Sequence, residues 1–102
     1  MQPNTNLQTV AFLAKSLSDE NRLRILLSLN NGKKSVNRIV EELEISQPLV
    51  SHHLRELRRS LLVRVERQGP FIYYELSDQR IVGILQDLDG LAMSLLSQRT
   101  AF

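Results

Sequence analysis

The residues best suited to chemistry lie between positions 46 and 59. Ser46 and Pro48 predict that a helix begins there, because serine caps free backbone N–H groups and proline fits a first turn. Apolar residues at helical spacing predict one buried stripe, made of Val50, Leu54, Leu57 and Leu61. The opposite face is polar and basic, with Gln47, Ser51, His52, Arg55, Arg58 and Arg59. Such side chains can read base edges and bind phosphates, although a solvated amphipathic helix has the same pattern.

The two histidines are neighbours in this helix, so their side chains point about 100° apart and cannot share a metal ion or a proton. His53 falls on the side of the apolar stripe, so we interpret it as a structural residue. The rest of the sequence has no paired acid and base, no nucleophile with a partner and no glycine-rich phosphate loop. The pattern therefore indicates that the protein is not an enzyme, and we expect no cofactor.

Charge is unevenly distributed along the chain. The overall net charge is only +2, but residues 46–68 hold five arginines and two glutamates, a net charge of +3. Residues 36–45 hold one arginine and three glutamates, a net charge of −2. Positive charge thus gathers on the polar helix and on the segment after it, which is the pattern expected for an anionic polymer partner.

Length and composition limit the class of protein. A chain of 102 residues predicts one domain over 1–102, and 42% hydrophobic residues are ordinary for a globular protein. The absence of cysteine excludes disulfides, thiolate metal sites and thiol redox sensing. It is compatible with a reducing cytoplasm, where we expect the protein. The apolar runs are too short to span a membrane, so we expect no membrane partner.

Several elements must position the polar helix. Helical periodicity predicts a first helix over about 6–17 and a second helix capped by Ser18, whose many leucines and isoleucines make it the buried centre. Ser35 is expected to cap a third helix, and residues 33–35 form a connector with some strand character. The turn of residues 44–46 is too tight for antiparallel helices, so a helix-turn-helix is predicted over about 36–60.

After Ser60 the apolar period changes from helical to alternating. Two strands are predicted over about 62–76, with Ile72, Tyr74 and Leu76 facing the core and a turn over 67–70. A helix-turn-helix followed by a hairpin with a basic tip is a winged helix, with Arg67 and Gln68 at the wing. The fold class is therefore mainly α with a small β-hairpin (α+β), in the order α-α-α-α-β-β-α.

The last predicted helix, about 78–98, has a wide apolar stripe that a small domain cannot cover. Such a stripe favours an interface. Together with the first helix it supplies the expected dimer contacts: Leu7, Val10, Leu13, Ile84, Leu88, Leu91 and Leu95. Gly83 and Gly90 lie seven residues apart on one face, and either permit a close helix crossing or bend the helix.

Three blocks, over residues 17–26, 46–58 and 62–76, resemble the ArsR/SmtB family of bacterial and archaeal winged-helix transcription regulators. The resemblance implies a homodimer, through the first and last helices, that represses an operator until an effector binds. It also implies that Gln47, Ser51, His52 and Arg55 read double-stranded DNA and that Arg67 and Gln68 bind phosphate. For Arg58 and Arg59, phosphate contact and plain solvation both remain open.

The sequence departs from the family at its sensing sites. Ser35 and Asn37 stand where metal-sensing members have cysteines, and Asp87 or Asp89 lacks a partner histidine, because no histidine follows His53. Carboxylates without imidazole make a poor transition-metal site, so no metal site is predicted. Glu44 and Leu61 stand where the family often has glycine, which indicates either a different backbone or a strained left-handed residue.

The sequence thus predicts a sequence-specific DNA-binding regulator, a repressor that binds a near-palindromic operator as a homodimer. Its effector is expected to need neither cysteine nor metal, and its identity is unknown. Two alternatives stay open at this point: a winged-helix module that binds another protein through its apolar last helix, and a metal sensor with a non-standard carboxylate site.

Overall fold

The computed structural model describes residues 4–99 and contains five α-helices, a 3-10 turn and one β-hairpin over that range. The helices are α1 (Leu7–Ser16), α2 (Glu20–Ser28), α3 (Val36–Leu43), α4 (Gln47–Arg59) and α5 (Arg80–Arg99). The 3-10 turn η1 (Leu29–Asn31) follows α2, and strands β1 (Val63–Gln68) and β2 (Phe71–Leu76) precede α5. The predicted fold class and element order are confirmed.

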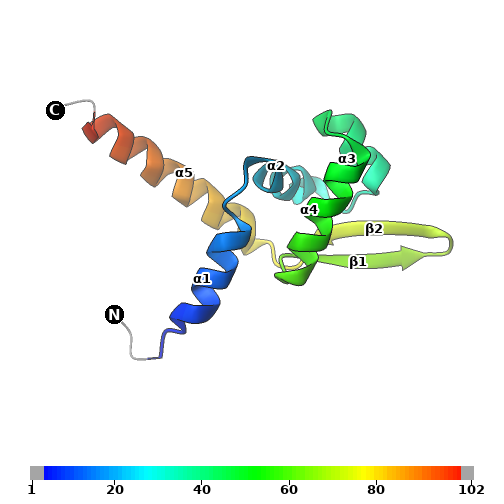
Figure 1. The fold of residues 1–102 in the computed structure, drawn as a ribbon, viewed down its shortest axis with the longest axis horizontal. Helices are drawn as coiled ribbons and strands as arrows, with labels where there is room; N and C mark the ends of the chain where they lie inside the picture. Colours follow the sequence, from blue (N-terminus) through cyan, green and yellow to red (C-terminus); the bar gives the residue numbers. More distant parts are fainter. Residues whose placement is uncertain (1–3, 100–102) are drawn as a thin grey trace.

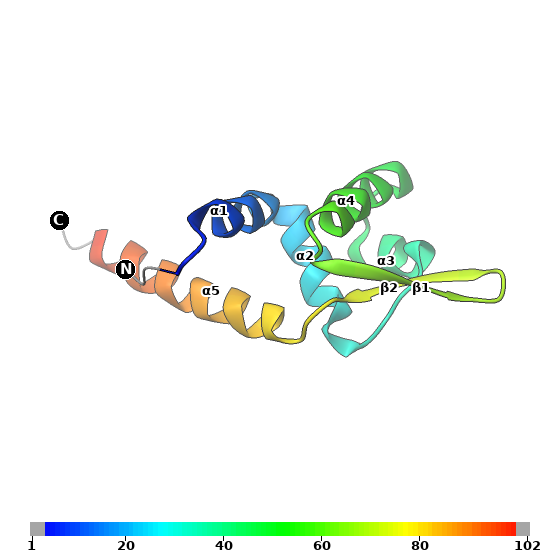
Figure 2. The same cartoon turned by 90° about the horizontal axis from the view of Figure 1, so that it is seen from below.

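The helices α2, α3 and α4 form the centre of the molecule, with the hairpin projecting on one side and α1 and α5 on the other (Figure 1). The same arrangement is seen from below in Figure 2. The core is made by side chains from α2, α3, α4, the base of the hairpin and the first turns of α5. Its fully buried members are Ile25, Leu26, Leu29, Ile39, Val50, Leu54 and Leu57. The prediction that the second helix is the buried centre is therefore correct.

The helix starts follow from local hydrogen bonds. Ser35 caps α3, since its Oγ accepts from the backbone N–H of Arg38 at 3.2 Å. The prediction that Ser18 caps α2 is wrong. Asp19 is the cap, because its Oδ1 accepts from the N–H of Arg22 at 3.1 Å, whereas the Ser18 hydroxyl donates to the Lys15 carbonyl. A carboxylate at this position also interacts favourably with the positive end of the helix dipole.

The hairpin pairs Val63 with Leu76 and Gln68 with Phe71, so only residues 69 and 70 form its turn. The predicted turn over 67–70 was too long, because Arg67 and Gln68 belong to β1. The prediction that Ile72 faces the core is also wrong: its side chain is 39% exposed, because the hairpin extends beyond the helices that could cover it. Lys34 bridges to Tyr74, which confirms the strand character of the connector.

The helices α1 and α5 are poorly covered. The helix α1 has no buried residue, and in α5 only Ile81, Val82 and Leu85 are buried, all in its first turns. Over residues 4–99, no helix is long and apolar enough to cross a membrane. Most apolar side chains of α1 and of α5 beyond Leu85 therefore remain exposed, and their contact with a partner stays a prediction.

Candidate nucleic-acid interface

The helix α4 is held by three residues of its predicted apolar stripe, and its polar face is left outward. The fourth, Leu61, was wrongly predicted to be buried: it follows the end of α4, has a left-handed backbone with φ 67° and is 77% exposed. Val50, Leu54 and Leu57 are fully buried against α2, α3 and the hairpin. The turn before α4 contains Glu44 in the left-handed conformation, with φ 55° and ψ 42°, and its N–H donates to the Val40 carbonyl at 2.9 Å. This turn redirects the chain sharply between α3 and α4, as the predicted helix-turn-helix requires.

Ser46 occupies the cap position of α4, but its side chain makes no capping hydrogen bond. Pro48 lies in the first turn, where its missing N–H is not needed for the helix. The predicted start of α4 is therefore correct in position, while the serine hydroxyl does not take the expected role.

The outward face of α4 carries the six side chains that the sequence singles out: Gln47, Ser51, His52, Arg55, Arg58 and Arg59. All are exposed except Ser51, which is half-buried. Two of them interact, since the Gln47 amide donates to the Ser51 hydroxyl at 3.1 Å. Arg59 pairs with Glu56 at 3.3 Å. Arg55 and Arg58 form no ion pair within residues 4–99, so their guanidinium groups are available to another molecule.

On the wing, the charges are mostly neutralised. Arg64 pairs with Glu75 across the hairpin at 2.7 Å. Glu66 accepts from the Gln68 amide at 3.1 Å and lies 3.2 Å from the Lys33 ammonium. These contacts lower the pKa of Glu66, chiefly through the bond from Lys33. Arg67 is exposed and without an ion pair in the described part of the chain.

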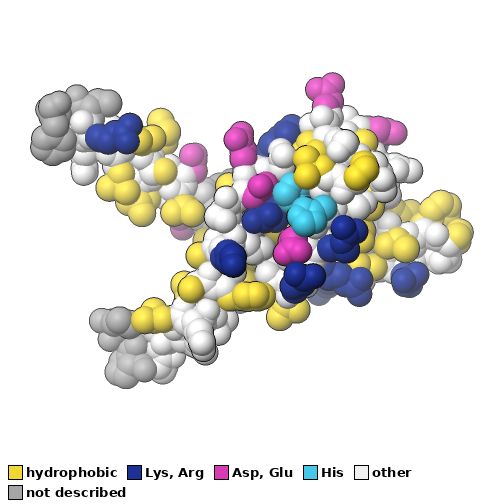
Figure 3. All heavy atoms as spheres, in the orientation of Figure 1, with side chains coloured by type: hydrophobic (Ala, Val, Ile, Leu, Met, Phe, Trp, Pro, Cys, Tyr) yellow, Lys and Arg dark blue, Asp and Glu magenta, His cyan; other side chains and the backbone are white. Residues whose placement is uncertain are grey.

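Figure 3 shows this side of the molecule. The histidines lie near its centre, and basic side chains gather beside them and toward the base of the wing. The exposed basic residues of α4 and β1 are Arg55, Arg58, Arg59, Arg64 and Arg67. The positive charge that the sequence concentrates over residues 46–68 is thus exposed on α4 and on the hairpin.

His53 is buried, with 4% of its surface exposed, as its place on the apolar side predicts. Its Nε2 lies 3.7 Å from the Asp19 carboxylate and its Nδ1 lies 3.5 Å from Nη1 of Arg22. Burial lowers the pKa of His53, and the nearby Arg22 lowers it further, while Asp19 opposes the shift. A neutral ring with its proton on Nε2 suits both neighbours, because Nδ1 then accepts from Arg22.

Arg22 is a residue whose role sequence reasoning missed. Its Nε donates to the Ser16 carbonyl at 2.7 Å, and its Nη2 lies 3.5 Å from the Lys15 carbonyl. It therefore joins the carboxyl end of α1 to His53 in α4. The available signal was its position three residues after Asp19, in the first turn of a helix whose middle residues Ile25 and Leu26 are buried.

Four side chains stand at the positions where metal-sensing relatives were expected to have ligands: Ser35, Asn37, Asp87 and Asp89. Ser35 uses its hydroxyl to cap α3, and the two aspartates of α5 are exposed. Within residues 4–99, no three or more His, Cys, Asp or Glu side chains are grouped so that they could hold a metal ion.

The chain is similar to known proteins over most of its length. Residues 19–65 match the family model described as "Bacterial regulatory protein, arsR family". The transcriptional repressor SdpR of Bacillus subtilis is 38% identical over 73 residues, which cover 72% of this chain and 77% of SdpR.

Two solved structures extend the similarity to the fold. HlyU from Vibrio cholerae, named a transcriptional activator, superposes with a TM-score of 0.74 at 32% identity, covering 83% of this chain and 96% of HlyU. A winged helix-turn-helix DNA-binding domain from Mycobacterium bovis, described as homodimeric, superposes with a TM-score of 0.78 at 24% identity, covering 96% of this chain and 95% of that domain.

Proposed function

Because this chain belongs to the arsR family of bacterial regulatory proteins, we propose that it represses transcription by binding a near-palindromic operator as a homodimer. Family membership makes it a DNA-binding transcriptional regulator and not an enzyme. The operator, the dimer and the direction of regulation are the parts that we propose.

The observation that carries the proposal is the outward face of α4. Gln47, Ser51 and Arg55 present an amide, a hydroxyl and a guanidinium from successive turns of one exposed face. Amides pair with adenine and guanidinium groups with guanine in the major groove, which is wide enough to admit a helix. We assign base reading to these three side chains and to His52, and phosphate contacts to Arg58, Arg59, Arg67 and Gln68.

The dimer is supported by exposed apolar side chains on α1 and α5. The predicted contacts Leu7, Val10, Ile84, Leu88, Leu91 and Leu95 are all between 53% and 58% exposed. Leu13 is half-buried and packs against the core. The homodimeric Mycobacterium bovis domain shares the fold. In a symmetric dimer, two α4 helices about 34 Å apart would enter successive major grooves of a near-palindromic site.

The similarity to SdpR, which is named a transcriptional repressor, supports repression, although HlyU is named an activator. A protein that covers an operator beside a promoter represses by occlusion. Because the chain has no cysteine, we propose an effector that binds without thiol chemistry and without metal. The place of action is the cytoplasm, where the DNA lies.

The proposal is tested by selecting bound DNA from random fragments and measuring the affinity of the selected site. Arg55→Ala should weaken that site by about 1–3 kcal/mol, or about 5- to 150-fold, and relax its sequence preference. Arg80→Ala is a matched control, because Arg80 is exposed but paired with Asp78 at the start of α5. Equal losses on selected and random DNA would show that Arg55 does not read bases. Failure to select any DNA would refute the operator.

A further inference from the structure

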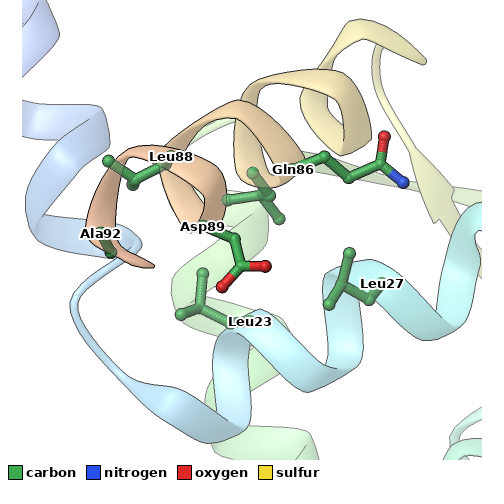
Figure 4. Close-up of a pocket in the computed structure, with 7 residues that line it drawn as sticks. Leu23, Leu27, Gln86, Leu88, Asp89 and Ala92 are labelled. Carbon is green, nitrogen blue, oxygen red and sulfur yellow. The ribbon is translucent and has the colours of Figure 1, made fainter. Parts of the chain in front are cut away.

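A groove lies between α2 and α5, outside the surface assigned to DNA (Figure 4). Its volume is about 480 Å³, which is within the range of small-molecule sites. Its walls are apolar, with Leu23 and Leu27 on α2 and Leu85 and Leu88 on α5. Leu27 is 46% exposed and Leu88 is 53% exposed, so both keep apolar surface that a ligand could cover.

Two polar residues line this groove, Gln86 and Asp89, and the carboxylate of Asp89 is the one that carries charge. In Figure 4 it points from α5 into the space beside Leu23 and Leu27. Within residues 4–99 it forms no hydrogen bond or ion pair. A carboxylate next to leucine side chains loses hydration when the groove is filled, and that loss is costly unless a positive group pairs with it. An anionic ligand is disfavoured by the same charge.

The groove occupies a different side of α5 from the surface that faces α1. A second apolar depression, between α1 and α5, is lined by Val10, Leu13 and Ile84 among others. Asp89 follows Ile84 by five residues, so it lies about 140° around the helix from it. Leu85 lines both depressions, and Leu88 belongs both to the groove and to the proposed dimer contacts. A ligand beside Asp89 and a partner on the Ile84 side would therefore meet along these two residues.

We propose that this groove binds a lipophilic organic cation, a molecule with an apolar body and a protonated amine or quaternary ammonium group. The apolar body packs between the leucines of α2 and α5, and the positive group pairs with Asp89. The charge distinguishes this ligand from neutral apolar molecules of the same size.

The groove is placed to influence DNA binding. The helix α2 lines it with Leu23 and Leu27 and sends Ile25 and Leu26 into the core that supports α4. The helix α5 carries the proposed dimer surface on its other side. A ligand that changes the packing of α2 on α5 changes the position of each α4 relative to the dimer. This regulatory consequence rests on the proposed function, whereas the binding site does not.

The binding site is tested on the full-length chain without DNA, by calorimetry and by NMR titration. The probes are phenethylammonium and phenethyl alcohol, which have the same apolar body and differ in charge. We expect the ammonium to bind about fivefold more tightly, as one partly exposed ion pair allows. Asp89→Asn should abolish that preference. Asp87→Asn, which removes a carboxylate from the same helix outside the groove, should retain it.

A second variant tests the apolar walls. Leu27→Ser should weaken both probes to a similar extent, and because Leu27 is half exposed the protein should remain folded. Equal affinity for the two probes, a preference that survives Asp89→Asn, or no binding at millimolar concentrations would each overturn the proposal.

The regulatory arm is measured separately, as release of the selected DNA by phenethylammonium. Release from the wild-type protein but not from Asp89→Asn is expected. Release that is equal for the two proteins, or absent at saturating probe, would overturn the link to DNA. A protein that binds the probe but no DNA at all would instead refute the proposed function.

Discussion

Glu44 should make the protein less stable than glycine would at the same position. It is exposed, and its φ of 55° places it in the left-handed region, which costs a residue with a Cβ about 1–2 kcal/mol. Glycine avoids that cost but loses about 0.5–1 kcal/mol more conformational entropy on folding. Glu44→Gly should therefore raise the free energy of unfolding by about 0.5–1 kcal/mol and raise Tm by about 2–8 °C.

Glu41→Gly is the matched control, because Glu41 is also an exposed glutamate but lies inside α3. Glycine in a helix interior lowers the free energy of unfolding by about 1 kcal/mol. Urea unfolding of the three proteins should be compared at one protein concentration, because a dimer gains stability with concentration. We expect the free energy of unfolding to decrease for Glu41→Gly and to increase for Glu44→Gly. A lower stability for Glu44→Gly would refute the assignment of left-handed strain to this turn.

Two further predictions concern His53 and the dimer surface. Since burial holds the pKa of His53 below its ordinary value of 6.5, its contribution to stability is present above pH 6.5 and is lost as the pH falls below that value. The urea concentration at the midpoint of unfolding should therefore decrease as the pH is lowered from 7.5 to 5.5. The variant His53→Gln should show a weaker decrease. An equal decrease in the variant and the wild-type protein would contradict the assignment to His53. Leu91→Asp places a charge on a surface that is 54% exposed, so it should shift sedimentation toward monomer while the monomer stays folded. A variant that remains fully dimeric would exclude α5 from the interface.

The sequence predicted the fold well because its signals were local. Helical leucine spacing and alternating strand residues each act over a few residues, and the elements they predict are present within two residues of their observed ends. Of the three predicted serine caps, only Ser35 makes the capping hydrogen bond. The inward position of His53 followed from the same periodicity. The cap of α2 was missed because Ser18 and Asp19 are both good capping residues, and only the backbone direction decides between them.

Contacts between distant residues could not be predicted in the same way. Arg22 reaches across to the end of α1 and to His53, and nothing in its neighbours along the chain specifies those partners. The strand alternation continues to the tip of the hairpin, so Ile72 has the pattern of a core residue although no helix covers it. The alternative backbones considered at Glu44 and Leu61 were resolved by their positive φ values, 55° and 67°.

The charge that is available to DNA differs from the charge that a count suggests. Residues 46–68 carry five arginines, but Arg59 and Arg64 are paired with glutamates. Unpaired guanidinium groups, at Arg55, Arg58 and Arg67, can release counterions from phosphates without first breaking an ion pair within the protein. They lie on α4 and on β1, the two elements to which we assign the DNA contacts. The distribution of unpaired groups, and not the net charge of +2, is therefore what favours this face for an anionic polymer.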